Sequence, residues 1–149
     1  MNKSGTPSYA ISHRGAFREA IELTTTSSNV VSNIISVNTN NGAINTASYA
    51  RFGNVVSLYI VWNNKNAIVV PPSGNITNIG VGNLVSGLRS AVPMMAGWTH
   101  GDDAGAAWFR IDGTGNNGAI YLGGCEGTGT TRTIAANSRF DIHTTYVIP

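Results

Sequence analysis

Apolar and polar residues alternate in short segments of this chain, and Gly and Asn turns separate the segments. The most apolar of these segments runs from Val55 to Trp62, directly after the turn pair Gly53-Asn54. Four of its apolar residues share one face at a period of two, and this face is predicted to lie in the core: Val56, Leu58, Ile60 and Trp62. Many short strands at such spacing predict an all-β domain, either a compact β-barrel or a sandwich of jelly-roll or Greek-key type.

Two further turn signals predict hairpins. Asn40-Asn41-Gly42 follows the β-like segment Val30–Val37, and we expect the strands on either side of this turn to pair. Gly113-Thr114-Gly115-Asn116 separates residues 106–112 from 118–122 and predicts a second hairpin. The last strand is expected to carry apolar residues on one face and polar ones on the other: Arg139, Asp141 and His143. Shorter strands are expected at residues 67–70, near 76–81 and near 92–98.

The first 29 residues differ from the rest. An apolar face and an i,i+4 pair between Arg18 and Glu22 predict a short helix near Arg14–Leu23. The Thr- and Ser-rich segment 24–29 then indicates a linker or turn. The chain is therefore predicted to have two parts, an N-terminal segment with a short helix and linker at residues 1–29 and a β-rich domain at residues 30–149.

Composition excludes several classes of function. Only 11% of the 149 residues are charged, and the net charge of +2 comes from Lys and Arg spread along the chain, so no nucleic-acid site is expected. No apolar run reaches the length of a membrane span, and Met1 to Ala10 lack the apolar core of a secretory signal, so we expect a soluble chain made in a cytoplasm. Cys125 is the only cysteine; it cannot form an internal disulfide and is expected to be a small buried side chain.

Patterns for catalysis and metal binding are weak. A glycosidase needs two facing carboxylates, and Asp102-Asp103 lies in a Gly-rich loop that is typical of a solvated turn. Ser86 does not sit in a nucleophile elbow. The three histidines lack the spacing of metal ligands, and the oxygen-rich turn after Asp112 lacks the acidic density of a calcium loop. The sequence therefore predicts no enzyme, no metal and no cofactor.

The strongest candidate site is a group of five residues: Trp98, His100, Trp108, Arg110 and Asp112. In the strand that holds the last three, Phe109 and Ile111 are expected to face the core and their neighbours to face outward. Saccharides are recognised by aromatic faces and by charged or amide groups that bind neighbouring hydroxyls. The alternative is that both tryptophans are core or interface residues and that Arg110 and Asp112 form a surface ion pair.

Three stretches of the C-terminal half carry a family resemblance: Gly97-Trp98, Trp108-Phe109-Arg110-Ile111-Asp112, and Gly118-Ala119-Ile120-Tyr121 after a Gly/Asn turn. Together they resemble the receptor-binding head domains of phages that infect Gram-positive bacteria, especially the lactococcal baseplate proteins. The resemblance implies a compact trimeric β-domain at a tail tip that holds host cell-wall saccharide or glycerol-phosphate polymer. That family often has His where this chain has Arg110, and the arginine fork suits a phosphate or carboxylate on the glycan.

Three functions remain open from the sequence. The first is a homotrimeric phage tail or baseplate receptor-binding protein of the virion, which binds a cell-wall polysaccharide or teichoic-acid-like polymer and contacts other baseplate proteins through its N-terminus. The second is a structural baseplate or tail-fibre connector whose aromatic group is buried between subunits. The third, a small glycan hydrolase, has the least support because no carboxylate pair is marked.

Overall fold

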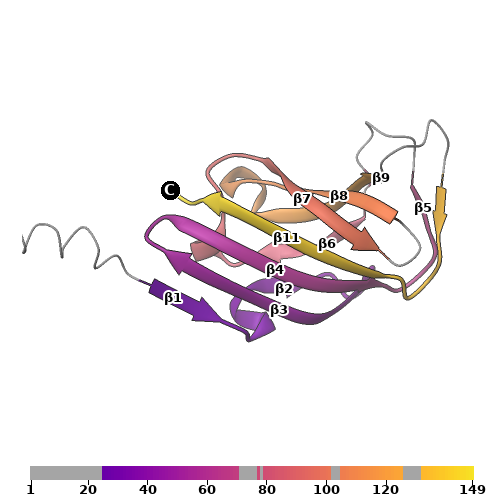
Figure 1. Ribbon diagram of the computed structural model, residues 1–149, viewed down its shortest axis with the longest axis horizontal. Helices are drawn as coiled ribbons and strands as arrows, with labels where there is room; N and C mark the ends of the chain where they lie inside the picture. The colour runs from indigo at the N-terminus through magenta and orange to yellow at the C-terminus, as the bar shows by residue number, and fades with distance from the viewer. Residues whose placement is uncertain (1–24, 71–76, 78, 102–104, 126–131) are drawn as a thin grey trace, which may run out of the picture.

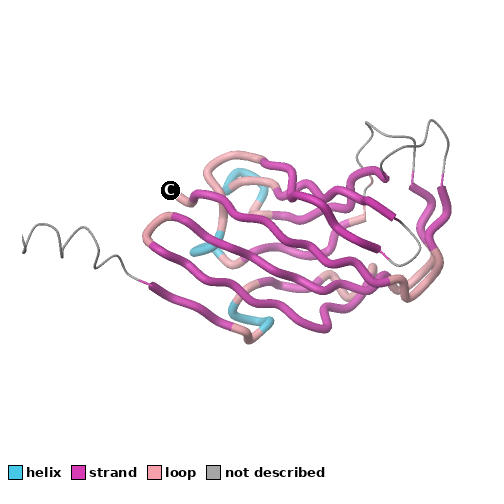
Figure 2. The backbone as a smooth tube through the Cα atoms, viewed as in Figure 1, coloured by secondary structure: helices cyan, strands magenta, loops and turns pink. Residues whose placement is uncertain are grey.

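The computed structural model describes residues 25–70, 77, 79–101, 105–125 and 132–149 (Figures 1 and 2). This part of the chain is built of strands and three short 3-10 helices, η1 (Val31–Asn33), η2 (Ser86–Leu88) and η3 (Thr114–Asn116). The strands are β1 (Thr25–Ser28), β2 (Ile35–Val37), β3 (Gly42–Phe52), β4 (Val55–Asn64), β5 (Ile68–Val70), β6 (Gly80–Leu84), β7 (Met94–Gly101), β8 (Gly105–Ile111), β9 (Ala119–Cys125), β10 (Arg132–Ile134) and β11 (Arg139–Val147).

Nine of these strands form one antiparallel sheet in the order β1-β3-β4-β11-β7-β8-β9-β6-β2, and β5 pairs with β10 separately. The large sheet curls over, so that β2 and β6 lie behind β3, β4 and β11 (Figure 1). No hydrogen-bonded ladder joins the edge strands β1 and β2 within the described residues. The predicted all-β class is confirmed, but the closed barrel, one of the two predicted forms, does not occur among the described strands.

The core lies between the two layers of the curled sheet and follows the predicted alternation. The four residues expected on the inner face of β4 are fully buried: Val56, Leu58, Ile60 and Trp62. The Trp62 ring packs edge-on against Phe109 of β8, with centroids 6.3 Å apart, and lies 5.3 Å from Phe140 of β11. Burial of each such side chain contributes about 1.5–3 kcal/mol to the stability of the fold. The three packed rings therefore help to hold β4, β8 and β11 together, and β8 carries part of the candidate site.

The structure confirms two of the predicted turns. Gly53 adopts a φ of 59° and closes the hairpin of β3 and β4. The segment after β8 forms η3 and ends in two residues of positive φ, Asn117 at 57° and Gly118 at 63°, which return the chain into β9. The polar and apolar faces predicted for β11 are also observed, with the apolar face buried.

The turn at Asn40-Asn41-Gly42 does not join a hairpin, so that prediction was wrong. Strand β2 pairs with β6 instead of β3, and the turn carries the chain from one layer to the other. Its backbone is held on both sides: the Asn38 N–H donates to Val81 O at 2.9 Å, and the Lys65 N–H donates to Asn41 O at 2.8 Å. The turn residues are typical of a hairpin, but these hydrogen bonds to residues distant in sequence determine which strand pairs with β2.

Residues Thr25–Ser28 are an edge strand rather than a linker or turn. Thr is β-branched and suits an extended backbone, and the 11-residue strand β3 offers an unpaired edge to which β1 adds. The predicted helix at Arg14–Leu23 lies outside the described residues, and the domain division at residue 29 stays a prediction. In the middle of the chain, β6 and β7 begin a few residues later than expected. No helix in the described part is long and apolar enough to span a membrane.

Candidate functional site

The outward face of the β8–β9 hairpin holds three large side chains. Trp108 and Arg110 lie on β8, on the side opposite the fully buried Phe109 and Ile111. Tyr121 of β9 stands opposite Arg110 in the strand register. All three outward side chains are half-buried. We call Trp108, Arg110 and Tyr121 the β8–β9 strip.

Trp108 owes its position to a glycine on the neighbouring strand. A Cβ atom added at the buried Gly123 would lie 2.2 Å from Cε3 and 2.3 Å from Cδ2 of the Trp108 ring. Ordinary carbon contacts are about 3.5–4.0 Å, so only glycine lets the indole lie directly on the β9 backbone. The strand register also shifts here, between Ala107 and Phe109, which places Trp108 at an irregularity of the ladder.

Arg110 is held in place by a buried carboxylate. Its Nε donates to Oδ1 of Asp112, and the Nδ2 of Asn116 donates to Oδ2 of the same carboxylate at 2.9 Å. Asp112 is only 3% exposed, whereas the Arg110 side chain is 35% exposed. The two Nη groups of Arg110 make no hydrogen bond with any described residue. Asp112 therefore positions the guanidinium, and Arg110 presents the charge at the surface.

The turn that carries Asp112 and Asn116 is itself fixed. The Asp112 N–H donates to Ala119 O at 2.8 Å, and the Thr114 N–H donates to Ser90 O at 2.9 Å. Gly113 is buried, and a Cβ atom there would lie 3.0 Å from the Ala91 carbonyl oxygen. The Arg110 support is thus anchored to the segment between η2 and β7.

Trp98 and His100 lie on β7, the strand next to β8. His100 pairs in register with Ala106, and a register shift between Ala96 and Thr99 spans Trp98. The structure therefore brings the two predicted segments side by side in the sheet, while the side chains of Trp98 and His100 lie outside the described part, as do Asp102 and Asp103. No three His, Cys, Asp or Glu side chains cluster as metal ligands among the described residues.

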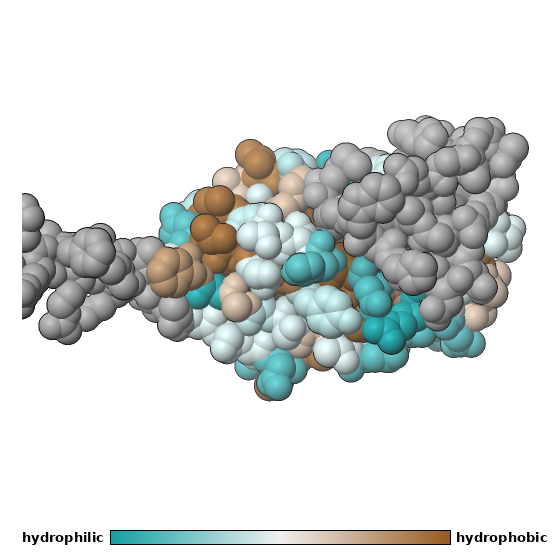
Figure 3. Space-filling model, viewed as in Figure 1, coloured by the Kyte–Doolittle hydropathy of each residue, from teal (hydrophilic) through white to brown (hydrophobic). Residues whose placement is uncertain are grey.

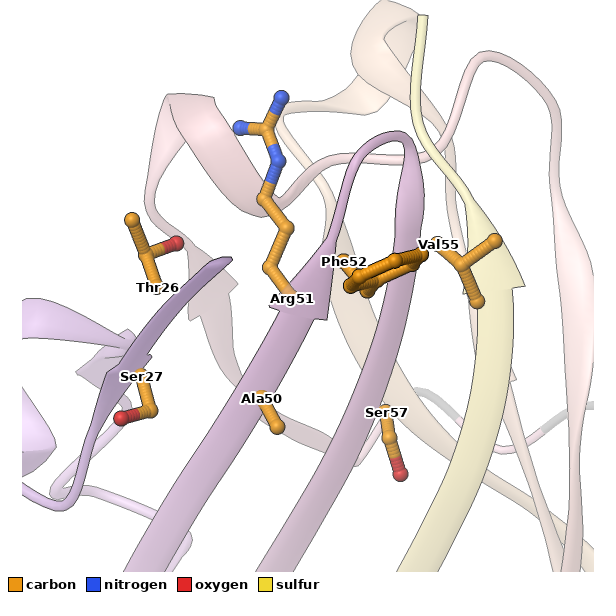
Figure 4. Close-up of a pocket in the computed structure, with 7 residues that line it drawn as sticks. All are labelled: Thr26, Ser27, Ala50, Arg51, Phe52, Val55 and Ser57. Carbon is orange, nitrogen blue, oxygen red and sulfur yellow. The ribbon is translucent and has the colours of Figure 1, made fainter. Parts of the chain in front are cut away.

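A different surface lies at the end of the sheet where β1 begins. A shallow groove of about 420 Å³ is lined by Thr26, Ser27, Ala50, Arg51, Phe52, Val55 and Ser57 (Figure 4). Arg51 bends over the hairpin, where its Nε donates to Gly53 O at 2.6 Å. Phe52, Val55 and Val147 are about half or more exposed and stand in one row across β3, β4 and β11. We call these three the apolar row.

The apolar row lies at the end of the molecule where hydrophobic atoms gather in Figure 3. Thr25, the first residue of β1, pairs with Phe52, so the chain enters the described fold beside this row. Single exposed apolar residues are common on protein surfaces, whereas these three are neighbours in the strand register.

The sequence identified Trp108, Arg110 and Asp112 but missed Tyr121, Gly123 and Asn116. The register of the predicted hairpin would have placed Tyr121 beside Arg110. The burial of Asp112 had no local signal, because it depends on the turn packing against residues 90–92. A comparison of the sequence with models of protein families and with curated proteins finds no match.

Proposed function

We propose that this chain is a receptor-binding protein of a phage tail or baseplate, which adheres to a saccharide on the host cell surface through the β8–β9 strip. One observation carries the proposal: Trp108, Arg110 and Tyr121 share an outward face, and the buried Asp112 fixes the cation among them. A site whose groups are already held in place loses less entropy on binding.

In the proposed site, the two aromatic rings make apolar contacts with the sugar and the arginine makes hydrogen bonds. The indole of Trp108 and the ring of Tyr121 offer apolar surface to the C–H side of a sugar ring. Arg110 offers its two Nη groups to hydroxyl, phosphate or carboxylate oxygens of the glycan, and its planar fork suits the two anions best. The proposed ligand is therefore a cell-wall polysaccharide or teichoic-acid-like polymer that carries negative charge.

The proposal includes a homotrimer on the virion, attached to other tail proteins through the N-terminal residues. The apolar row supports it, because the row lies beside the point where the chain enters the described fold and would be covered by a neighbouring subunit. Three weak sites on one trimer, repeated over a tail, give firm adhesion through avidity. Adhesion of this kind requires no catalysis.

The same apolar row favours a second candidate, a structural connector that binds no glycan. The third candidate, a glycan hydrolase, has no support in the described residues, where the two carboxylates present, Asp112 and Asp141, are each paired with an arginine. Release of reducing sugar from wall material would revive it.

Cell labelling tests the proposal. The fluorescently labelled full-length chain is applied to a panel of Gram-positive cells that differ in their wall glycans. We expect labelling of some strains by the unmodified protein, and a loss of about tenfold or more in Arg110→Ala, since hydrogen bonds to a charged group contribute about 1.5–3 kcal/mol.

The chain provides a matched control. Arg139 and Asp141 form the same i,i+2 pair on β11, with an Arg139 Nε to Asp141 Oδ1 distance of 2.9 Å. Arg139→Ala is expected to label cells like the unmodified protein. Equal labelling by the two arginine variants would show that the β8–β9 strip is not the binding site. If the unmodified protein labels no strain, the structural connector becomes the better candidate.

A further inference from the structure

A second groove, of about 650 Å³, lies where the β2–β3 turn meets the end of β4. None of the described residues that line it belongs to the β8–β9 strip or to the groove in Figure 4. Four asparagine residues line it, together with Lys65 and Thr39: Asn45, Asn63, Asn64 and Asn137. Such a concentration of amides around one hollow needs a physical explanation, because each amide group offers donors and acceptors in fixed directions.

Two of these amides are arranged by a β-bulge. The register of β3 against β4 shifts between Ile44 and Thr46, so Asn45 is the extra residue of the bulge. Its Nδ2 donates to Oδ1 of Asn63 at 2.8 Å, and the Nδ2 of Asn63 donates to Asn137 O at 3.0 Å. Bulges commonly redirect a side chain next to a binding site. Each of the two amides keeps hydrogen-bonding capacity for a further partner.

Asn64 lines the groove and has a buried amide group. Its side chain is fully buried, and its Nδ2 donates to Asn66 O at 2.8 Å and to Ala135 O at 2.7 Å. The Oδ1 atom, by contrast, accepts no hydrogen bond from the described residues. A buried acceptor without a partner costs about 1–3 kcal/mol. Because this atom has almost no exposed surface, the side chains of the groove that can contact a ligand directly include those of Asn45, Asn63 and Lys65.

Lys65 gives the groove its charge. Its side chain is exposed. Asp112 and Asp141, the two carboxylates of the described part, are each paired with an arginine, and no ion pair joins either of them to Lys65. None of the described residues that line the groove carries a carboxylate. The lining therefore combines one positive charge with several amide groups.

We infer that this groove is a second binding site, for a small anionic polyhydroxyl compound. The hydroxyls of this compound bind the Asn45 and Asn63 amides, and its phosphate or carboxylate group binds the Lys65 ammonium. Amide side chains suit hydroxyls because they donate and accept at once, and the ammonium selects a charged ligand over a neutral one. The site is separate from the one proposed for cell adhesion.

Chemical-shift titration of the isotope-labelled full chain tests this inference. The probes are glycerol 3-phosphate, glucuronate and glucose, which separate a phosphate source from a carboxylate source and both from a neutral sugar. We expect saturable shifts of the Asn45 and Asn63 side-chain amide signals with one or both anions. Lys65→Ala should weaken that binding about tenfold, the effect of losing one hydrogen bond to a charged group.

Two further variants make the result specific. Asn83 is an exposed asparagine on β6 that does not line the groove, so Asn83→Ala should bind like the unmodified protein, whereas Asn45→Ala should bind weakly. Arg110→Ala should leave these shifts unchanged, so the groove stands even if the adhesion site fails. An absence of saturable shifts with all three probes, equal binding of glucose and the anions, or unchanged affinity in Lys65→Ala would overturn the inference.

Discussion

Gly123→Ala tests the position of Trp108 without touching a side chain of the site. The new Cβ atom would lie 2.2–2.4 Å from three ring carbons of Trp108, against an ordinary contact of about 3.5–4.0 Å. The ring cannot remain, and because it is half-buried it can swing outward. The variant should therefore fold, with the indole displaced from the β9 backbone.

The cost can be estimated from the area that the ring loses. A tryptophan buries about 150–250 Å² when fully covered, so a half-buried one loses roughly 100 Å², worth about 2.5 kcal/mol at most. Alanine is better than glycine within a strand by about 0.5–1 kcal/mol, which offsets part of the loss. We expect a net decrease of about 1–2 kcal/mol in the free energy of unfolding.

Urea denaturation followed by circular dichroism measures this change, and the Trp108 indole N–H resonance reports the ring directly. Gly115→Ala is the control, because a Cβ atom at that exposed glycine meets nothing within 4 Å. It should change stability by no more than about 0.5 kcal/mol. A Gly123→Ala variant as stable as the unmodified protein, with its Trp108 resonance in place, would refute the packing described for β8 and β9.

Two other results are expected. Burial raises the pKa of the Tyr146 phenol, whose hydroxyl donates to Leu88 O at 2.6 Å. The fold thus favours the neutral phenol over the phenolate. The contribution of Tyr146 to the free energy of unfolding is therefore complete below the pKa of the unfolded chain, about 10, and decreases as the pH rises above that value. Tyr146→Phe should lose about 1 kcal/mol at neutral pH and flatten the stability profile above pH 10 in chemical denaturation, and an unchanged alkaline slope would contradict this. The proposed homotrimer predicts that Phe52→Asp lowers the molecular mass measured by light scattering from that of a trimer, and an unchanged trimer mass would exclude the apolar row as the subunit contact.

Local patterns predicted much of the fold, because strand alternation depends only on neighbouring residues. The inner faces of β4 and β8 followed from a period of two. The partner of β2 did not, since hydrogen bonds from Asn38 and Lys65 to distant residues decide it. Tertiary contacts also turned Thr25–Ser28 into an edge strand.

The candidate site divides in the same way. Trp108 and Arg110 were predicted from outward alternation on one strand. The supporting role of Asp112 depends on a turn packed against another segment, and Gly123 matters only because β9 lies beneath the indole. The second groove, lined by Asn45, Asn63, Asn64 and Asn137, is formed by the turn after β2, the bulge in β3 and the end of β4. No single stretch of sequence therefore predicts it.

The central claim is that the β8–β9 strip binds a cell-surface glycan through a cation fixed by Asp112. Isothermal titration of purified wall polysaccharide into Arg110→Ala and Arg139→Ala compares two arginines that are each paired with the aspartate two residues further along the chain. The claim predicts a dissociation constant about tenfold or more higher for Arg110→Ala, with Arg139→Ala like the unmodified protein. Equal dissociation constants for the two variants would contradict it.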